Sequence, residues 1–180
     1  MKHFVIALVC LGLHAPAHGA TKEALMAKYR GAKNVRAEIV QEKQAEYLLK
    51  PLISHVTMTF DQKTLVWDIK DPVPSRIVLE QDRIEVDGKP MPPVGAKSQE
   101  SLASIVRLAR QLVAGDLEGL EKDYNVKMIE NALLVEPKKE SVLKKMTISF
   151  NDSLDLKTIE MVLPDEKLTL RFQSIVQSRG

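Results

Sequence analysis

Few residues in this sequence combine a reactive side chain with a spacing that would support catalysis. The 180-residue chain has four histidines and one cysteine, and His3, His14, His18 and Cys10 all lie within the first 18 residues. His55 is therefore the only histidine in the rest of the chain. A zinc site or a catalytic triad usually needs several histidine or cysteine side chains. We therefore expect no metal site, no catalytic residue and no cofactor.

Four carboxylates lie close together in the sequence, at Asp68, Asp71, Glu80 and Asp82. Paired carboxylates can act as a general acid and a general base. In alternating strands, however, such residues are expected to face solvent, and His55 is also predicted to face solvent. The sequence has no phosphate-binding loop, nucleophile elbow or dinucleotide fingerprint. These observations predict a protein that is not an enzyme.

The composition predicts one globular domain with a real core. Apolar residues make up 44% of the chain and charged residues 28%, and the net charge is +2. The sequence has no long basic run and no alternation of basic with aromatic residues. Nucleic acid is therefore not an expected partner, and we expect a monomer.

The first 17 residues have the pattern of a signal peptide. A short basic segment precedes the apolar residues 4–13, which are too few to span a bilayer. Ala15 and Ala17 supply small residues at positions −3 and −1, so we expect cleavage after Ala17, with Ala20 as the alternative. The mature chain, residues 18–180, would be a single exported domain.

One long amphipathic helix is predicted at residues 98–115, SQESLASIVRLARQLVAG. Ser98 suits the N-cap and Gly115 suits a left-handed C-cap. Six apolar residues recur on one face with a period of 3.6: Leu102, Ile105, Val106, Ala109, Leu112 and Val113. A single apolar helix between two sets of strands must cover something, so we expect it to act as a lid.

Most of the remaining sequence alternates between apolar and polar residues, which is typical of half-buried strands. Strands are predicted at residues 35–39, 52–60, 64–69, 76–80, 83–86, 124–130, 132–137, 144–150, 156–163 and 168–172. A short helix is predicted at residues 21–30. Residues 116–123 fit a weak helix or a loop, and residues 41–51 fit either strand or helix.

Strands at this spacing predict one large antiparallel sheet whose apolar face must be covered. Such a sheet can close into a barrel, pack on a second sheet or curl around helices. Because helices are predicted at both ends of the first set of strands, we expect the third arrangement. The predicted fold class is therefore mainly β (α+β), with a curved antiparallel sheet or incomplete β-barrel and a helical lid.

The apolar face contains four methionines, Met58, Met128, Met146 and Met161, among aliphatic side chains. Methionine suits adaptable apolar surfaces, so this face would either line a lipid pocket or form an ordinary core. Trp67 lies on the same face, and its indole N–H needs a hydrogen-bond partner if it is buried.

A group of lysines follows the later apolar segments, at Lys138, Lys139, Lys144 and Lys145. They fit the tip of a hairpin. They also fit a docking patch for an acidic partner or for anionic lipid headgroups.

Four segments occur in a recognisable order before the last three predicted strands: TLVWD at residues 64–68, PVP at 72–74, SRIVLEQD at 75–82 and ALLVEP at 132–137. Taken together, they resemble the LolA-like periplasmic lipoprotein carriers. The resemblance implies an incomplete antiparallel barrel with helices as a lid, located in the periplasm of a Gram-negative bacterium. Aromatic residues make up only 4% of the chain and His55 stands where relatives often have glycine, so this member would be divergent.

The resemblance also implies a function. The chain would bind lipid acyl chains or lipoproteins in an apolar cavity, receive them from an inner-membrane transporter and deliver them to an outer-membrane acceptor. The cavity would be lined by Val56, Met58, Phe60, Leu65, Trp67, Ile77, Leu102, Ile105, Val106, Ala109, Met146, Ile148, Met161 and Leu170. The alternative is a periplasmic sensor or adaptor that uses the same fold to bind a partner protein.

Overall fold

The computed structural model describes residues 21–30, 32–61, 63–80, 83–91, 108, 111 and 115–179. The predicted signal peptide lies outside the described residues, and so does most of the predicted helix at 98–115. The same holds for four of the predicted cavity residues: Leu102, Ile105, Val106 and Ala109. In the described part of the chain, no helix is both long enough and apolar enough to cross a membrane.

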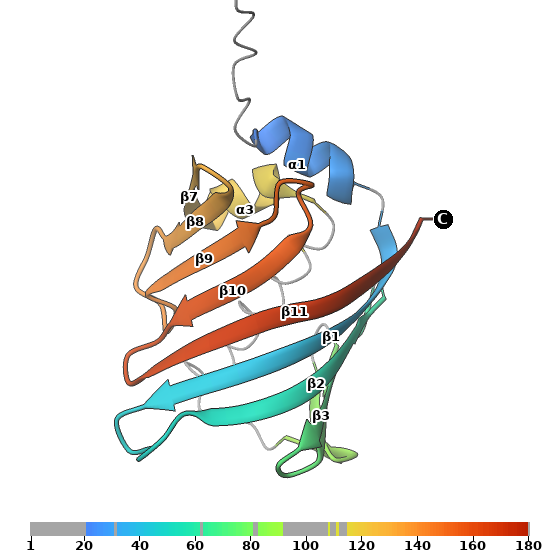
Figure 1. The fold of residues 1–180 in the computed structure, drawn as a ribbon, viewed down its shortest axis with the longest axis vertical. Coiled ribbons are helices and arrows are strands. Elements are labelled where there is room, and N and C mark those ends of the chain that lie inside the picture. The colour runs from blue at the N-terminus through green and yellow to red at the C-terminus, as the bar shows by residue number, and fades with distance from the viewer. Residues whose placement is uncertain are drawn as a thin grey trace, which may run out of the picture.

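The described residues form one curved sheet of eleven antiparallel strands with two short helices, α1 (Lys22–Tyr29) and α3 (Leu117–Asp123) (Figure 1). The strands are β1 (Ala32–Ala45), β2 (Leu52–Phe60), β3 (Leu65–Asp71), β4 (Ser75–Leu79), β5 (Ile84–Val86), β6 (Lys89–Pro90), β7 (Tyr124–Ile129), β8 (Ala132–Pro137), β9 (Lys145–Phe150), β10 (Leu156–Val162) and β11 (Glu166–Arg179). Their order in the sheet is β6-β5-β4-β3-β2-β1-β11-β10-β9-β8-β7. The predicted fold class is confirmed, because the sheet curls but ends at β6 and β7 without closing.

Local turn chemistry explains where neighbouring strands reverse. Between β2 and β3, the Asp61 carboxylate accepts hydrogen bonds from the backbone N–H groups of Lys63 and Thr64, at 2.8 and 2.7 Å. Between β5 and β6, Asp87 and Gly88 have φ values of 53° and 75°. Aspartate and glycine tolerate this left-handed backbone, which a two-residue hairpin turn requires. The predicted turn at Asp87 and Gly88 is confirmed.

The first and last strands, β1 and β11, pair at the centre of the sheet. Their register runs from Ala32 opposite Arg179 to Ala45 opposite Glu166. This pairing joins the strands of the N-terminal half to those of the C-terminal half in one sheet. The predicted last strand, residues 168–172, was too short, because β11 continues to Arg179.

A β-bulge explains the missed half of β11. The register shifts between Glu38 and Ile39 of β1, so that Phe172 and Ile175 of β11 both lie opposite inner residues. The bulge interrupts the two-residue alternation that identifies a strand in a sequence. Residues 41–45 were ambiguous for a related reason: β1 continues through them, but its inner positions change from aliphatic residues to Gln41 and Lys43.

The two helices begin at the capping residues that their sequences provide. The Thr21 hydroxyl accepts a hydrogen bond from the N–H of Ala24 at 3.2 Å, and the Asp116 carboxylate accepts one from Gly119 at 2.8 Å. The helix predicted at 21–30 is confirmed as α1, and α3 shows that residues 117–123 are helical rather than a loop. Gly115 has the φ of 66° expected of a left-handed C-cap residue.

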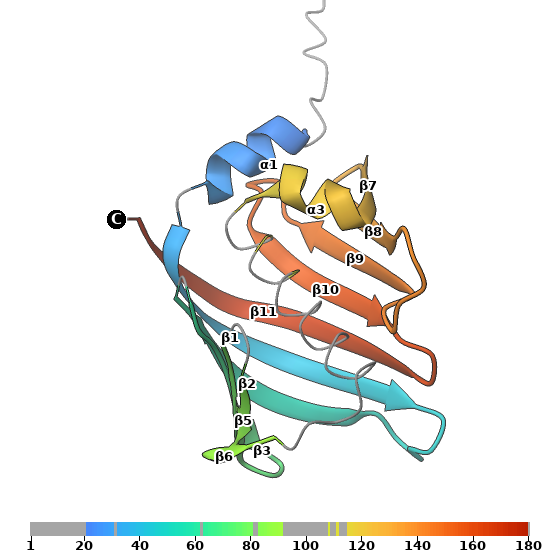
Figure 2. The same cartoon turned by 180° about the vertical axis from the view of Figure 1, so that it is seen from behind.

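Alternation along the strands places the apolar side chains on one face, called here the inner face. The two helices pack on this face at the β7–β9 end of the sheet (Figure 2). One buried cluster joins Leu25 and Tyr29 of α1 and Leu117 and Leu120 of α3 to side chains of β7, β8 and β9. A second buried cluster belongs to β1, β2, β3 and β11. Ile159 and Met161 pack against both, so the two clusters form a continuous apolar layer.

Candidate functional site

The inner face is the candidate site, and the ten predicted cavity residues that the structure describes all lie on it. Cross-strand pairs link them: Met58 lies opposite Trp67, and Trp67 lies opposite Ile77. Among the C-terminal strands, Met146 of β9 lies opposite Met161 of β10 on the same inner face. Four further members take alternate positions on the same strands: Val56, Phe60, Leu65 and Ile148. Leu170 lies on β11, opposite Ile159 of β10. The alternation in the sequence was therefore enough to assign these side chains to one face.

Burial divides these ten residues into two groups. Val56, Met58, Phe60, Leu65, Met146, Ile148 and Leu170 are buried and belong to the two core clusters. Trp67, Ile77 and Met161 are only half-buried. Packing of the first group stabilises the fold, whereas the second group leaves apolar surface uncovered. The apolar surface that the inner face leaves accessible is therefore built from the half-buried residues.

Other half-buried apolar residues extend this surface: Ile69, Leu79, Ile159, Leu168, Phe172 and Ile175. They lie on β3, β4, β10 and β11, and the buried side chains of β1 and β2 lie between these two sets of strands. Five of the six follow the strand alternation and were open to prediction. Ile175 was not, because it follows the bulge in the β1–β11 register.

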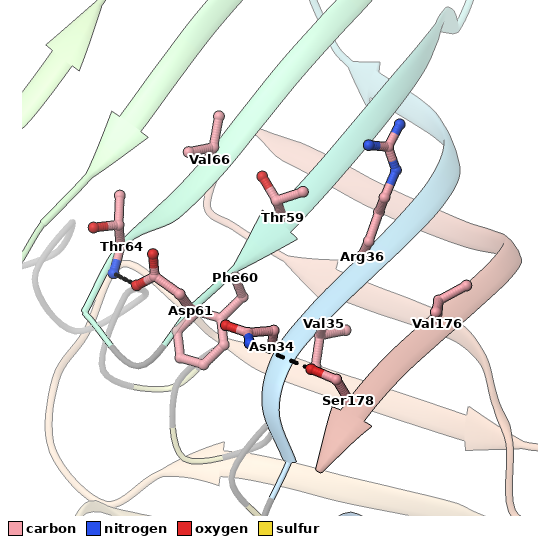
Figure 3. Close-up of a pocket in the computed structure, with 10 residues that line it drawn as sticks. All are labelled: Asn34, Val35, Arg36, Thr59, Phe60, Asp61, Thr64, Val66, Val176 and Ser178. Atoms are coloured by element: carbon pink, nitrogen blue, oxygen red, sulfur yellow. Dashed lines mark hydrogen bonds between the residues drawn. The ribbon is translucent and has the colours of Figure 1, made fainter. Parts of the chain in front are cut away.

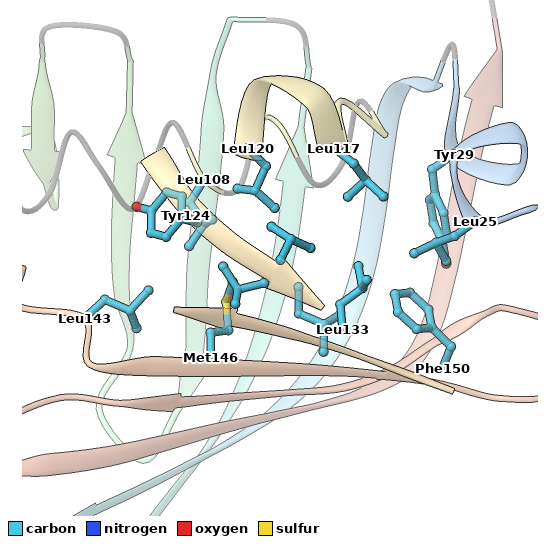
Figure 4. Close-up of a cluster of buried hydrophobic side chains, with 13 residues drawn as sticks. Leu25, Tyr29, Leu108, Leu117, Leu120, Tyr124, Leu133, Leu143, Met146 and Phe150 are labelled. Atoms are coloured by element: carbon cyan, nitrogen blue, oxygen red, sulfur yellow. The ribbon is translucent and has the colours of Figure 1, made fainter. Parts of the chain in front are cut away.

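The helix-covered end of the inner face is closely packed (Figure 4). Leu120 of α3 is 0% exposed, and it points toward the sheet together with Leu117. Leu108 is also buried in this cluster, although it was not assigned to the apolar face of the predicted helix. Tyr29 of α1 lies beside Phe150, with ring centroids 6.3 Å apart. This end of the face is therefore core.

Trp67 has the hydrogen-bond partner that its burial was expected to require. Its indole N–H donates to Oε1 of Gln41 at 3.2 Å. Gln41 is an inner-face residue of β1 and lies opposite Ser54 of β2. An indole N–H without a partner would be costly on an apolar face. The bond links the indole of β3 to a side chain of β1 across the intervening strand β2.

The next inner position on β1, Lys43, forms a charged end to this face. Its Nζ lies 2.5 Å from Oε2 of Glu166 and 5.8 Å from the centre of the Tyr47 ring. The hydrogen bond to Glu166, followed by that to Tyr47, raises the pKa of Lys43 above its usual value. Lys43 is therefore fully charged at neutral pH.

The residues first considered for acid–base chemistry lie apart from the inner surface. The Nδ1 of His55 lies 2.8 Å from Oδ1 of Asp71, and both side chains are exposed. Asp68 binds Lys70, and this hydrogen bond lowers the pKa of Asp68. A carboxyl with a lowered pKa is ionised at neutral pH and is a poor general acid. Glu80 is exposed, as predicted.

Two further points concern metal binding and Asp82, the last of the four clustered carboxylates. No three His, Cys, Asp or Glu side chains in the described part of the chain come close enough to hold a metal ion. Asp82 lies outside the described residues.

A separate pocket of about 330 Å³ lies at the ends of β1 and β11 (Figure 3). Several of its lining residues, among them Arg36, Thr59 and Val66, occupy the outward positions of their strands. Asn34 donates a hydrogen bond to Ser178 across it at 3.3 Å. Of the ten predicted cavity residues that the structure describes, only Phe60 lines this pocket. The pocket is therefore formed mainly by residues outside the predicted cavity.

The fold and the site together define an open antiparallel sheet that curls around an apolar face. No protein-family model matches the chain, and no curated protein matches it. Among solved structures, the chain is similar to a LolA superfamily protein from Nitrosomonas europaea, with 14% identity and a TM-score of 0.42, covering 89% of this chain and 94% of that one.

Two further solved structures are similar to the chain. The Pseudomonas aeruginosa MucA/MucB complex gives 9% identity and a TM-score of 0.45, covering 88% of this chain and 56% of that one. Lipoprotein LppX of Mycobacterium tuberculosis gives 14% identity and a TM-score of 0.33, covering 85% and 95%. Because every TM-score is below 0.5, we base no functional conclusion on these likenesses.

Proposed function

We propose that the chain is a non-enzymatic carrier that binds the acyl chains of lipids or lipoproteins against its inner face. In this proposal it moves them through the periplasm, from a transporter in the inner membrane to an acceptor at the outer membrane. The predicted signal peptide at residues 1–17 is the basis for placing the carrier in the periplasm.

One observation carries the proposal: half-buried apolar side chains lie on both sides of the buried β1–β2 region. Trp67 and Ile69 lie on β3, and Met161 and Phe172 lie on β10 and β11. Apolar surface left in contact with water favours an apolar ligand, at about 25 cal/mol for each Å² that is covered. Acyl chains fit such a surface because they need no hydrogen-bond partner.

The single tryptophan provides a direct test, because Trp67 lies on the proposed contact surface. The probe is a lysophosphatidylcholine whose acyl chain carries bromine, used below its micelle concentration. Bromine quenches tryptophan only at short range. We expect saturable quenching of Trp67 fluorescence, and no quenching by the unbrominated lipid.

A matched variant moves the tryptophan to the other side of the same strand. Val66 is the neighbour of Trp67 and takes the outward position, and it is also half-buried. In the double variant Val66→Trp with Trp67→Phe, bound probe should quench far less. Equal quenching in both proteins, or none in the wild type, would overturn the proposal.

A further inference from the structure

Exposed apolar side chains gather along one rim of the sheet. Among the described residues, ten large apolar residues are exposed, and seven of them lie on this rim: Tyr47, Leu49, Leu52, Ile53, Val73, Val142 and Val162. We define the loop rim as the loops at residues 46–51, 72–74, 138–144 and 163–165 with the strand ends beside them. Leu49 is 104% exposed and Val73 is 73% exposed. Side chains this exposed contribute nothing to the core.

The register of the strands shows that the loop rim is continuous. Leu52 lies opposite Lys43, and Ala45 lies opposite Glu166, so the β1–β2 loop adjoins the start of β11. Val162 lies opposite Lys145. Because neighbouring strands are about 4.8 Å apart, the rim from β2 to β9 spans about 20 Å. Figures 1 and 2 show these loops along one side of the molecule, away from α1.

Lysines accompany the apolar side chains on this rim. Within residues 46–51, 138–145 and 163–165, five lysines are exposed: Lys50, Lys138, Lys139, Lys144 and Lys145. Three carboxylates are exposed in the same ranges, at Glu46, Glu140 and Asp165, and Asp71 is exposed at the end of β3 beside residues 72–74. The rim therefore combines exposed aliphatic and aromatic side chains with an excess of positive charge. This combination is typical of surfaces that lie in the interface of an anionic membrane.

We propose that the loop rim docks on the surface of an anionic phospholipid bilayer. Leu49 and Tyr47 insert between the headgroups, and the lysines of the β8–β9 loop contact the phosphates. A bilayer fits better than a folded partner because the apolar side chains stand on separate loop tips. This surface goes beyond the proposed function, since membrane contact does not require ligand binding on the inner face.

The test measures co-sedimentation of the purified chain with vesicles. One set contains phosphatidylcholine only, and the other contains phosphatidylcholine with about one third phosphatidylglycerol. We expect binding to the anionic vesicles that weakens as salt is raised. Leu49→Asp should reduce the partition coefficient on the order of tenfold, because a leucine side chain leaves the interface.

Two variants make the result specific to the rim. Val176→Asp changes an apolar residue that is 67% exposed at the far end of β11, and it should leave vesicle binding unchanged. Lys144→Glu with Lys145→Glu should weaken binding to anionic vesicles only. Leu49 is fully exposed, so its substitution should not affect folding, and circular dichroism checks this.

The outcome is independent of acyl-chain binding, because Trp67 quenching by the brominated lysolipid should be unchanged in Leu49→Asp. Wild-type protein that stays in the supernatant with anionic vesicles would overturn the docking proposal. So would equal losses for Leu49→Asp and Val176→Asp.

Discussion

Placing a carboxylate on the inner face should weaken acyl-chain binding in a way that depends on pH. Ile77 of β4 is half-buried on the inner face and lies opposite Trp67. In the variant Ile77→Glu, an acyl chain packed against Trp67 would also cover the new carboxylate. The carboxylate must then be protonated or left charged against hydrocarbon, and protonation costs less.

The magnitude follows from the ordinary pKa of glutamate, about 4.3. Protonating this group at pH 7 costs about 3.7 kcal/mol, which corresponds to a loss of about 500-fold in affinity. At pH 5 the cost falls to about 1 kcal/mol, or about sixfold. Affinity in the variant should therefore rise as the pH falls, whereas the zwitterionic lysolipid keeps its own charge over this range.

The matched control is the next residue on the same strand. Val78 is also half-buried but faces outward, opposite Val66. Titration of the brominated lysolipid against Trp67 fluorescence should give Val78→Glu an affinity within about twofold of the wild type. Urea unfolding checks that both variants are folded. Equal affinities for Ile77→Glu and the wild type at pH 7 would refute the reasoning, as would a loss that is the same at pH 5.

Three further predictions concern the fold. Gly115→Ala should lower the free energy of unfolding in urea by at least about 1 kcal/mol, because φ is 66° and the added Cβ would lie 3.2 Å from the carbonyl carbon of Tyr29 and the backbone nitrogen of Arg30. Unchanged stability would contradict the left-handed cap. Tyr29→Phe should lower the free energy of unfolding by about 1–3 kcal/mol, because the hydroxyl donates to the C=O of Leu154 at 3.0 Å and accepts from the N–H of Leu156 at 2.9 Å, where the β9–β10 turn enters β10. A neutral result would show that water replaces this bridge. The hydrogen bond from Lys28 lowers the pKa of Asp155, so the stabilisation from this pair should be lost as pH falls through and below the ordinary aspartate pKa. Lys28→Met should therefore reduce the loss of unfolding free energy at acid pH. An unchanged acid dependence would exclude a contribution from the pair.

Strand alternation predicted most of the sheet because one face is apolar and the other is polar. The β2–β3 pair shows this clearly: Val56 and Met58 are buried, and His55 is exposed. In the β2–β3 pair, the outward side has one buried exception, Thr57, which is 8% exposed. Its hydroxyl donates to Glu38 at 3.0 Å, and neighbouring side chains cover it. Burial of an outward side chain depends on its neighbours on the adjacent strands, and these cannot be identified from the sequence of one strand alone.

Long-range pairing was not open to prediction from local patterns. The pairing of β1 with β11 joins residues more than 120 positions apart in the sequence. Nothing near Val35 specifies that Gln177 lies opposite it. The extra length of β11 was missed because its bulge breaks the two-residue period.

Sequence patterns predicted which face of the sheet holds the candidate site, but not which side chains on that face remain accessible. Alternation placed Met58 and Trp67 on the same side of the sheet, as the structure shows. Periodicity does not reveal which of these side chains is fully covered, so buried Met58 and half-buried Trp67 were indistinguishable. The partner of the indole, Gln41, was also missed. It lies on β1, two strands away from Trp67, in a segment whose polar residues hid the strand.

The central claim is that the inner face carries an acyl chain, and native mass spectrometry tests it most directly. The chain would be purified from the periplasm without detergent, and its bound material would be extracted with solvent. The account predicts extra mass that extracts as lipid or acylated peptide and is lost in Ile77→Glu but kept in Val78→Glu. A clean unliganded mass, from a protein that also takes up no brominated lysolipid, would contradict it.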